Sequence, residues 1–259
     1  MSKLKVVTFN IRCPWDEHDG INCQIHRMGA ILDKLDTELP DAVCFQEVPV
    51  KTADFLTRHL PEYEVIWRGR DADLNGEGLA IALRRQTVEF MSADFFWLSP
   101  TPYVPGSRYE VQSNCPRICL SAMIRMKEDG KVVRLYDNHL DHRGEPARVL
   151  GMKQVVEAIA KAQSTMDFPV FVMGDMNDTP ESECMTYARE NTVYPLTDLT
   201  DGIDHTFHGF GTVPAPYRID YIYSDAETAT KPHDVSVWKD EQDGIYLSDH
   251  YPICLTIEL

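Results

Sequence analysis

Polar side chains recur at the ends of apolar segments, where a buried unpaired acid or imidazole would be costly. Asn10 closes an apolar run near the N-terminus, and Glu47 follows the run Ala-Val-Cys-Phe. Asp175 and Asn177 follow the run Phe-Pro-Val-Phe-Val-Met in the same way. Strand ends can present side chains to a shared cleft while the core holds the backbone rigid. The positions of this kind are Asn10, Gln46, Glu47, His139, Asp175, Asn177, Asp220, Asp249 and His250.

Three of these side chains suit a divalent cation. Glu47 and Asp249 supply carboxylate oxygens and Asn10 supplies a neutral amide oxygen, which are ligands that hard cations prefer. A bound cation of this kind neutralises phosphate oxygens during the hydrolysis of a phosphate ester. These residues are therefore the candidate metal ligands.

The other side chains suit the remaining tasks of phosphoester hydrolysis. Asp175 or His250 could orient and deprotonate a water. Asn177 and His139 could donate hydrogen bonds to the charged transition state. A carboxylate paired with an imidazole, as Asp220 with His250, would set the histidine tautomer and raise its basicity. The residue types thus predict a phosphoesterase that activates water.

Each candidate also has an ordinary structural explanation. Asp and Asn favour turns, which would account for Asp175 and Asn177 without any chemistry. Asn10 could be a turn residue and Glu47 a solvated strand end, whereas His250 could be a satisfied buried histidine. Six polar clusters that each follow an apolar run favour a shared site over six separate turns.

The elements expected to position these residues are both strands and helices. Apolar residues at helical spacing predict helices, and β-branched and aromatic runs predict strands. Hairpins beside βα units favour two packed sheets over one parallel sheet, and no composition break divides the chain, so a single domain over residues 1–259 is expected. The expected helices cover 24–39, 52–60, 145–163 and 181–190, and the expected strands cover 4–11, 42–48, 63–68, 78–84, 87–98, 117–126, 131–139, 168–173, 217–223, 233–238 and 252–258.

The overall charge restricts the class of partner. The 259 residues carry a formal net charge of -16, and a strongly acidic chain repels polyanions at long range. Seven scattered cysteines without a CxxC motif argue against a disulfide framework or a zinc site. The N-terminus lacks a signal-peptide pattern, and no apolar run reaches the roughly 18 residues of a transmembrane helix. We therefore expect a cytoplasmic protein without a transmembrane segment.

The motifs, taken in order, resemble those of the endonuclease/exonuclease/phosphatase superfamily, which includes deoxyribonuclease I-like nucleases, inositol polyphosphate 5-phosphatases and nocturnin-type deadenylases. The resemblance runs from Asn10 to Pro252. It implies a four-layered α/β sandwich, with two mixed β-sheets packed face to face and flanked by helices, and a Mg²⁺ or Mn²⁺ cofactor. The motifs are TFN at 8–10, QE at 46–47, HLDH at 139–142, GDMN at 174–177, IDYI at 219–222 and SDH at 248–250.

The same resemblance implies a role for each matching residue. Asn10, Glu47 and Asp249 would surround the metal. His139 and Asn177 would contact the phosphate, Asp175 would orient the nucleophilic water, His250 would act as acid/base or phosphate ligand, and Asp220 would orient His250.

Two positions depart from the family pattern. The usual Asn-Thr-His reads Asp137-Asn138-His139, so an extra carboxylate either points into the opposite face of the sheet or alters the charge of the site. Arg12 stands where several nucleases carry an acidic ligand, and its guanidinium geometry suits a substrate phosphate.

Further residues are weaker candidates for binding substrate. Asp141 and His142 could support His139 or form a second metal site, and structural support is the favoured explanation. Glu77 could be an acidic hairpin tip, and Arg117 could pair with an acidic neighbour. The complete set of candidate substrate-binding residues is Arg12, Glu77, Arg117, Asp141 and His142.

Two loops are expected at the rim of the cleft, Trp15–Asp19 and 99–115. The second lies in a stretch from Phe96 to Ile118 that resembles a mostly bacterial, poorly characterised subgroup of the superfamily. The resemblance to this subgroup does not indicate a particular substrate.

Three functions compete. The favoured one is a phosphomonoesterase or phosphodiesterase acting on a small or polar organic phosphate. A nuclease or exoribonuclease would need a basic track with stacking aromatics, and no Lys/Arg-rich segment exists in the sequence. A catalytically inactive binding protein would be expected to lack some of Asp175, Asn177, Asp249 and His250, and all four are present.

Overall fold

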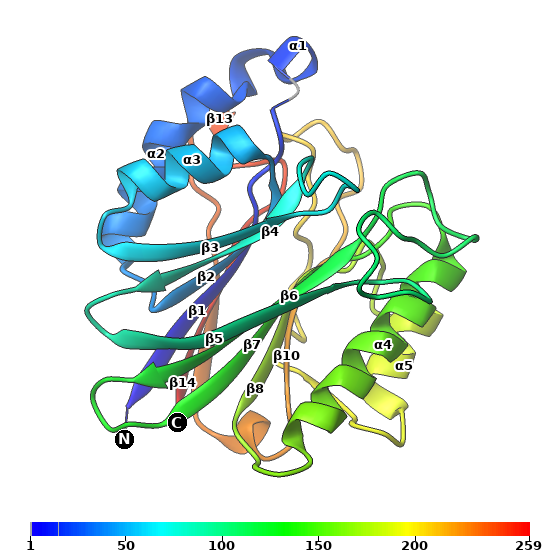
Figure 1. The fold of residues 1–259 in the computed structure, drawn as a ribbon. Helices are drawn as coiled ribbons and strands as arrows, with labels where there is room; N and C mark the ends of the chain where they lie inside the picture. The colour runs from blue at the N-terminus through cyan, green and yellow to red at the C-terminus, as the bar shows by residue number, and fades with distance from the viewer. Residues whose placement is uncertain (1, 15) are drawn as a thin grey trace.

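A computed structural model describes residues 2–14 and 16–259, and it contains two six-stranded sheets packed against each other. Figure 1 shows α2 and α3 outside one sheet and α4 and α5 outside the other, which gives the layer order helix, sheet, sheet, helix. The predicted four-layered α/β sandwich is confirmed. The helices are α1 Asp16–Asp19, α2 Gln24–Glu38, α3 Val50–His59, α4 Glu145–Gln163 and α5 Glu183–Glu190.

The first sheet has the strand order β11-β14-β1-β2-β4-β3. Its neighbouring strands β1 and β2 run parallel and are joined through α2. As a result the carboxyl ends of these two strands meet at one edge, with Asn10 beside Gln46 in the register. The strands are β1 Lys3–Asn10, β2 Ala42–Val48, β3 Tyr63–Gly69, β4 Gly78–Arg84, β11 His233–Val237 and β14 Ile253–Glu258.

The second sheet has the order β5-β6-β7-β8-β10-β9. Here β7 and β8 run parallel, joined through α4, and β10 runs antiparallel to β8. The strands are β5 Val88–Trp97, β6 Ile118–Met126, β7 Val132–His139, β8 Val170–Asp175, β9 Thr197–Asp198 and β10 Asp220–Ser224.

Three apolar clusters hold the layers together. The inner faces of the two sheets share a core that includes Leu4, Ile81, Leu120 and Phe171. Two outer clusters bury α2 and α3 against the first sheet, and α4 and α5 against the second. Burying a side chain of this kind contributes about 1.5–3 kcal/mol, so these interfaces fix the strand ends in space.

Small differences from the sequence expectations have local causes. The expected strand 217–223 begins only at Asp220, because the backbone of Tyr217 pairs with Phe207 instead of with β8. The expected strand 168–173 begins at Val170 and continues to Asp175, since Asp175 pairs with both neighbouring strands. The expected rim loop contains the short helix Asp16–Asp19, and Trp15 lies outside the described residues. All seven cysteines are free.

Among residues 2–14 and 16–259, no helix combines the length and the apolar character that crossing a membrane requires.

Asp137 lies between the sheets and not in the cleft. Its side chain is fully buried, and its Oδ1 accepts a hydrogen bond of 2.7 Å from Gln46 Nε2 on the facing sheet. Its other oxygen has no hydrogen-bond partner. Burial raises the pKa of Asp137 well above its ordinary value, because a buried carboxylate loses its hydration. Asp137, which replaces the family's Asn, therefore belongs to the core between the sheets and not to the candidate site.

This position generates a prediction about stability and pH. Because the folded state raises the pKa of Asp137, the folded protein binds the proton more tightly, and stability falls as pH rises above the unfolded-state value. Asp137→Asn removes this titration and keeps the acceptor for Gln46. We expect a gain on the order of 1–2 kcal/mol at pH 7, and a smaller or no gain near pH 4.

Urea unfolding of both proteins between pH 4 and pH 8 measures this difference. Asp36→Asn, at an exposed carboxylate on α2, is the control and is expected to leave the pH profile unchanged. If the free energy of unfolding depends on pH in the same way in wild type and Asp137→Asn, the folded state does not hold Asp137 as a neutral acid.

Candidate active site

Strand register brings three predicted residues together on the second sheet. His139 pairs with Asp175 across the parallel strands β7 and β8, and Asp175 pairs with Asp220 across the antiparallel strands β8 and β10. Gly174 permits this arrangement, because a Cβ there would lie 1.9 Å from the Asn138 carbonyl oxygen. His139 Nε2 lies 3.5 Å from Asp175 Oδ2.

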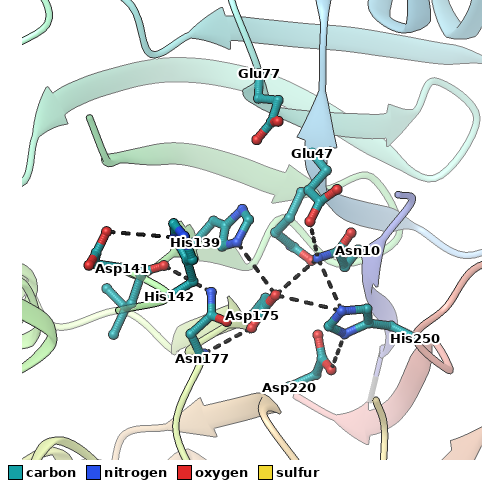
Figure 2. Close-up of polar contacts among 12 residues, drawn as sticks. Asn10, Glu47, Glu77, His139, Asp141, His142, Asp175, Asn177, Asp220 and His250 are labelled. Atoms are coloured by element: carbon teal, nitrogen blue, oxygen red, sulfur yellow. Dashed lines mark hydrogen bonds and ion pairs between the residues drawn. The ribbon is translucent and has the colours of Figure 1, made fainter. Parts of the chain in front are cut away.

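The first sheet contributes Asn10 from β1 and Glu47 from β2. Asn10 Nδ2 donates to Asp175 Oδ2 at 2.9 Å and to Glu47 Oε1 at 3.2 Å, so one amide links the two sheets (Figure 2). Glu47 has a φ of 61°, at the point where the pairing of β2 with β4 shifts register. Such a conformation costs of order 1–3 kcal/mol for a residue with a side chain and clusters at functional sites.

The loop before β14 brings the imidazole of His250. Its Nδ1 lies 2.8 Å from Asp220 Oδ2, and its Nε2 lies 3.5 Å from Asn10 Nδ2 and 3.9 Å from Asp175 Oδ2. Figure 2 shows the ring between Asp220 and Asn10. This contact with the carboxylate fixes the orientation of the ring.

Burial and mutual charge set the protonation of these groups. Burial alone would lower the pKa of His250, but the carboxylates of Asp220, Asp175 and Asp249 outweigh it and raise that pKa to about 10. Burial and the neighbouring Asp220 raise the pKa of Asp175 to about 7, against the opposing effect of His250. Burial, followed by the charges of Arg117 and Arg70, lowers the pKa of His139 well below its ordinary value. The cleft therefore contains a charged imidazole, a neutral imidazole and a carboxyl group that can exchange a proton near neutral pH.

The three candidate metal ligands lie beside this group. Burial and the negative charge of Glu47 raise the pKa of Asp249. The pKa of Glu47 is lowered, because a hydrogen bond from the Cys13 N–H and the charges of His250 and Arg12 outweigh its burial. The carboxylates of partly buried Glu47 and buried Asp249 are oxygen donors that fit a hard divalent cation. The Asn10 amide turns its nitrogen toward Glu47, and its oxygen accepts a hydrogen bond from the Arg12 N–H at 3.0 Å.

A second group within the described residues also has metal-ligand geometry. One ligand atom each from Asp175, Asp220 and His250 lie within 4.8 Å of one another. Within this group His250 Nδ1 lies 2.8 Å from Asp220 Oδ2, so these two ligand atoms are already paired with each other.

Arg12 faces carboxylates instead of an open phosphate pocket. Its Nη2 lies 3.1 Å from Asp19 Oδ1, and its Nη1 lies 3.4 Å from Asp249 Oδ2. Buried Arg27 fixes this region, because it donates to the carbonyl oxygens of Ile11 at 2.8 Å and of Leu247 at 2.8 Å. Arg12 thus balances the charge of Asp249.

Asn177 is close to Asp175 but is held in a turn. Its backbone N–H donates to Asp175 Oδ1 at 2.9 Å, and its Nδ2 donates to the Leu140 carbonyl at 3.0 Å. Its φ is 52°. An amide nitrogen carries two N–H groups, so one of them is available to a phosphate oxygen.

The other candidate residues lie to one side of this group. Asp141 accepts hydrogen bonds from the Ser113 hydroxyl and, at 2.6 Å, from the Gly144 N–H, so it anchors the 99–115 loop and the start of α4. His142 Nδ1 lies 3.1 Å from Arg117 Nη2. Glu77 pairs with Arg70 at 2.8 Å. Asp141 thus contacts the loop and the start of the helix.

Several residues near the site carried no recognisable sequence signal. Arg70, in the loop after β3, carries a positive charge that contributes to lowering the pKa of His139. The ring of Phe207 lies 5.0 Å from the ring of His250. Burial, together with the charge of nearby Asp175, raises the pKa of Tyr217. Only the tertiary structure brings these residues to the cleft.

Comparison with known proteins agrees with the fold and the motifs. The sequence profile of the Endonuclease/Exonuclease/phosphatase family matches residues 7–250, and the chain belongs to this family. The family name covers enzymes that cleave phosphate esters, which supports the same broad chemistry here. No protein with a curated description matches the chain.

Solved structures share the whole fold. The endonuclease/exonuclease/phosphatase from Bacteroides vulgatus has 28% sequence identity and a TM-score of 0.88, with 100% of each chain covered. The mannosyl-6-phosphatase of Bacteroides thetaiotaomicron has 23% identity and a TM-score of 0.85, covering 99% of this chain and 100% of its own. The human nocturnin catalytic domain with a bound sulfate anion has 15% identity and a TM-score of 0.74, covering 99% and 93%. The mannosyl-6-phosphatase and the nocturnin domain are similar to this chain in fold.

The pair of Asp220 and His250 generates a prediction. Asp220→Asn removes the carboxylate that contributes most to raising the pKa of His250, so this pKa is expected to fall by roughly 1 to 3. The ring nitrogen chemical shifts of His250, followed against pH in metal-free buffer, measure it.

Asp204→Asn is a matched control, because Asp204 lies 2.9 Å from His205 in a similar pair at the surface. It is expected to leave the pKa of His250 unchanged. An unaltered His250 titration in Asp220→Asn would remove Asp220 from its orienting role.

Proposed function

We propose that the protein is a Mg²⁺- or Mn²⁺-dependent phosphoric ester hydrolase that directs water at the phosphorus of a small or polar organic phosphate. The observation that carries this proposal is the group formed by Asp175, Asp220 and His250, which lies beside the carboxylates of Glu47 and Asp249. Membership of the Endonuclease/Exonuclease/phosphatase family supports the same chemistry.

Asn10, Glu47 and Asp249 would hold the cation. When bound, it would neutralise phosphate oxygens and make the phosphorus more open to attack. Arg12 and the Cys13 N–H hold Asp249 and Glu47 in place at 3.4 Å and 2.9 Å. Ligands held in this way lose little entropy on binding the ion.

Asp175 is the group we assign to the water. Its Oδ2 faces the cleft between Asn10 and His139, and a carboxyl group that titrates near pH 7 can accept a proton there. His250 carries a positive charge that Asp220 stabilises, and it would donate a hydrogen bond to the developing negative charge. His139 and Asn177 would donate to the phosphate oxygens.

Charge favours a small substrate over a polynucleotide. The net charge of -16 opposes long-range attraction of a polyanion. A structural neighbour is named mannosyl-6-phosphatase, which favours sugar phosphates as the first compounds to test. Seven thiols fit a reducing compartment, so we propose that the protein acts in the cytoplasm.

Metal removal and loss of His250 test this function. Chromogenic phosphate esters and a panel of sugar phosphates are expected to be hydrolysed with Mg²⁺ or Mn²⁺ and not with EDTA. His250→Ala is expected to lower kcat by about 10²–10⁴-fold, which is the usual scale for an acid–base group. The exposed His233 provides the control variant His233→Ala, which is expected to retain full activity. Turnover that persists in EDTA would contradict the proposal.

Loss of a metal ligand gives a test that does not depend on the substrate. Asp249→Ala removes one of two carboxylates from the donor set, so Mn²⁺ is expected to bind at least about 10-fold more weakly. Isothermal titration calorimetry measures this affinity, with Asp201→Ala at an exposed carboxylate as control. Equal Mn²⁺ affinity in wild type and Asp249→Ala would place the ion elsewhere.

A further inference from the structure

Unpartnered hydrogen-bond donors lie beside His139. Arg117 is 4% exposed, and its Nε and Nη1 have no hydrogen-bond partner; the same is true of Arg70 Nε. A buried donor without a partner costs about 1–3 kcal/mol. In native structures such groups indicate a bound water, ion or ligand.

These arginines line a recess of matching size. The recess has a volume of about 10 Å³ and is bounded by Arg70, Glu77, Arg117, Ile118 and His139. A volume of roughly 10–15 Å³ accommodates one water-sized group. The recess therefore has space for a single oxygen atom.

The recess is continuous with the site described above. On one side, His139 reaches Asp175 at 3.5 Å. On the other, Glu77 contacts the Cys13 thiol at 3.3 Å, and the N–H of the same cysteine donates to Glu47 at 2.9 Å. In Figure 2, Glu77 and His139 lie on either side of Glu47. A phosphate beside Glu47 and Asp175 would have one face toward the recess at His139.

The neighbouring carboxylates orient the arginines without occupying their free N–H groups. Asp141 Oδ1 lies 3.9 Å from Arg117 Nε, which is beyond hydrogen-bond distance, and His142 takes only Nη2. Glu77 pairs with Arg70 Nη2. The remaining donors point to an acceptor supplied from outside the chain.

We propose that this recess binds one terminal oxygen of the substrate phosphate and makes the enzyme selective for phosphomonoesters over phosphodiesters. The inference rests on the proposed phosphoesterase function. A monoester carries three terminal oxygens, so one can enter the recess while two remain for the metal ligands and for the donors at His139 and Asn177. A diester has only two and leaves buried donors unpaired. Sites built to pair a polar group reject analogues that lack it by large factors, up to about 10⁴–10⁵.

Binding of two simple anions tests the recess without turnover. With Mg²⁺ present, wild type is expected to bind inorganic phosphate at least about 10²-fold more tightly than dimethyl phosphate, measured by calorimetry. Arg117→Gln is expected to lose at least about 10-fold in phosphate affinity and little in dimethyl phosphate affinity. Equal binding of both anions by wild type would overturn the proposal, as would an unchanged ratio in Arg117→Gln, because the recess would then hold only water.

Matched variants separate binding from folding. Arg70→Gln alters the same recess from a less buried position and decides the question if Arg117→Gln does not fold. Arg125→Gln, which removes a surface arginine paired with Glu89 at 3.1 Å, is the control and is expected to retain the wild-type ratio.

Kinetics distinguish this inference from the proposed function. Wild type is expected to prefer 4-nitrophenyl phosphate to methyl 4-nitrophenyl phosphate in kcat/KM, and both recess variants are expected to reduce that preference. Equal cleavage of both esters would support the phosphoesterase and overturn the selectivity. If neither ester is cleaved, the proposed function is in question, and the two anions still decide whether the recess recognises a terminal phosphate oxygen.

Discussion

Four carboxylates lie close together at one edge of the two sheets, three of them buried, and their mutual repulsion is the constraint around which the site is arranged. Glu47, Asp175, Asp220 and Asp249 all lie within reach of His250, whose positive charge they stabilise. Asp220 and Asp175 repel each other when both are charged, and so do Glu47 and Asp249. The packing of the surrounding core holds these side chains in place despite their repulsion.

The site is divided between the sheets, so its geometry depends on how they pack. Asn10 from β1 and Asp175 from β8 meet across the interface at 2.9 Å. Behind them, Gln46 and Asp137 form a second polar link between the same two sheets, at 2.7 Å. Substitutions in the shared apolar core would shift one half of the cleft against the other, and displacements of about 1 Å can cost roughly 10²-fold in rate.

Sequence patterns could predict the residues that follow apolar runs. Asn10, Glu47, Asp175, Asp220 and His250 each end or follow such a run. Strand register pairs Asp175 with Asp220, whereas the loop before β14 brings His250 to them. Periodicity alone predicts two packed sheets with helices. The order of the motifs adds the prediction of the four-layered fold.

Other parts of the site depend on contacts that no local pattern encodes. Arg70 and Phe207 reach the cleft from loops, and Arg27 holds backbone carbonyls that are distant in sequence. The position of Asp137 between the sheets, and not in the cleft, required the register of β7 against the facing sheet. The protonation of Asp175 and His250 likewise follows from burial and from partners on other strands.

The most direct test of the account is hydrolysis in ¹⁸O-labelled water, with the phosphate released from 4-nitrophenyl phosphate analysed by mass spectrometry. The account predicts one solvent oxygen in each phosphate, with Mg²⁺ or Mn²⁺ required and EDTA abolishing the reaction. Solvent oxygen in the nitrophenol, or equal turnover in EDTA, would contradict attack of a metal-assisted water on phosphorus.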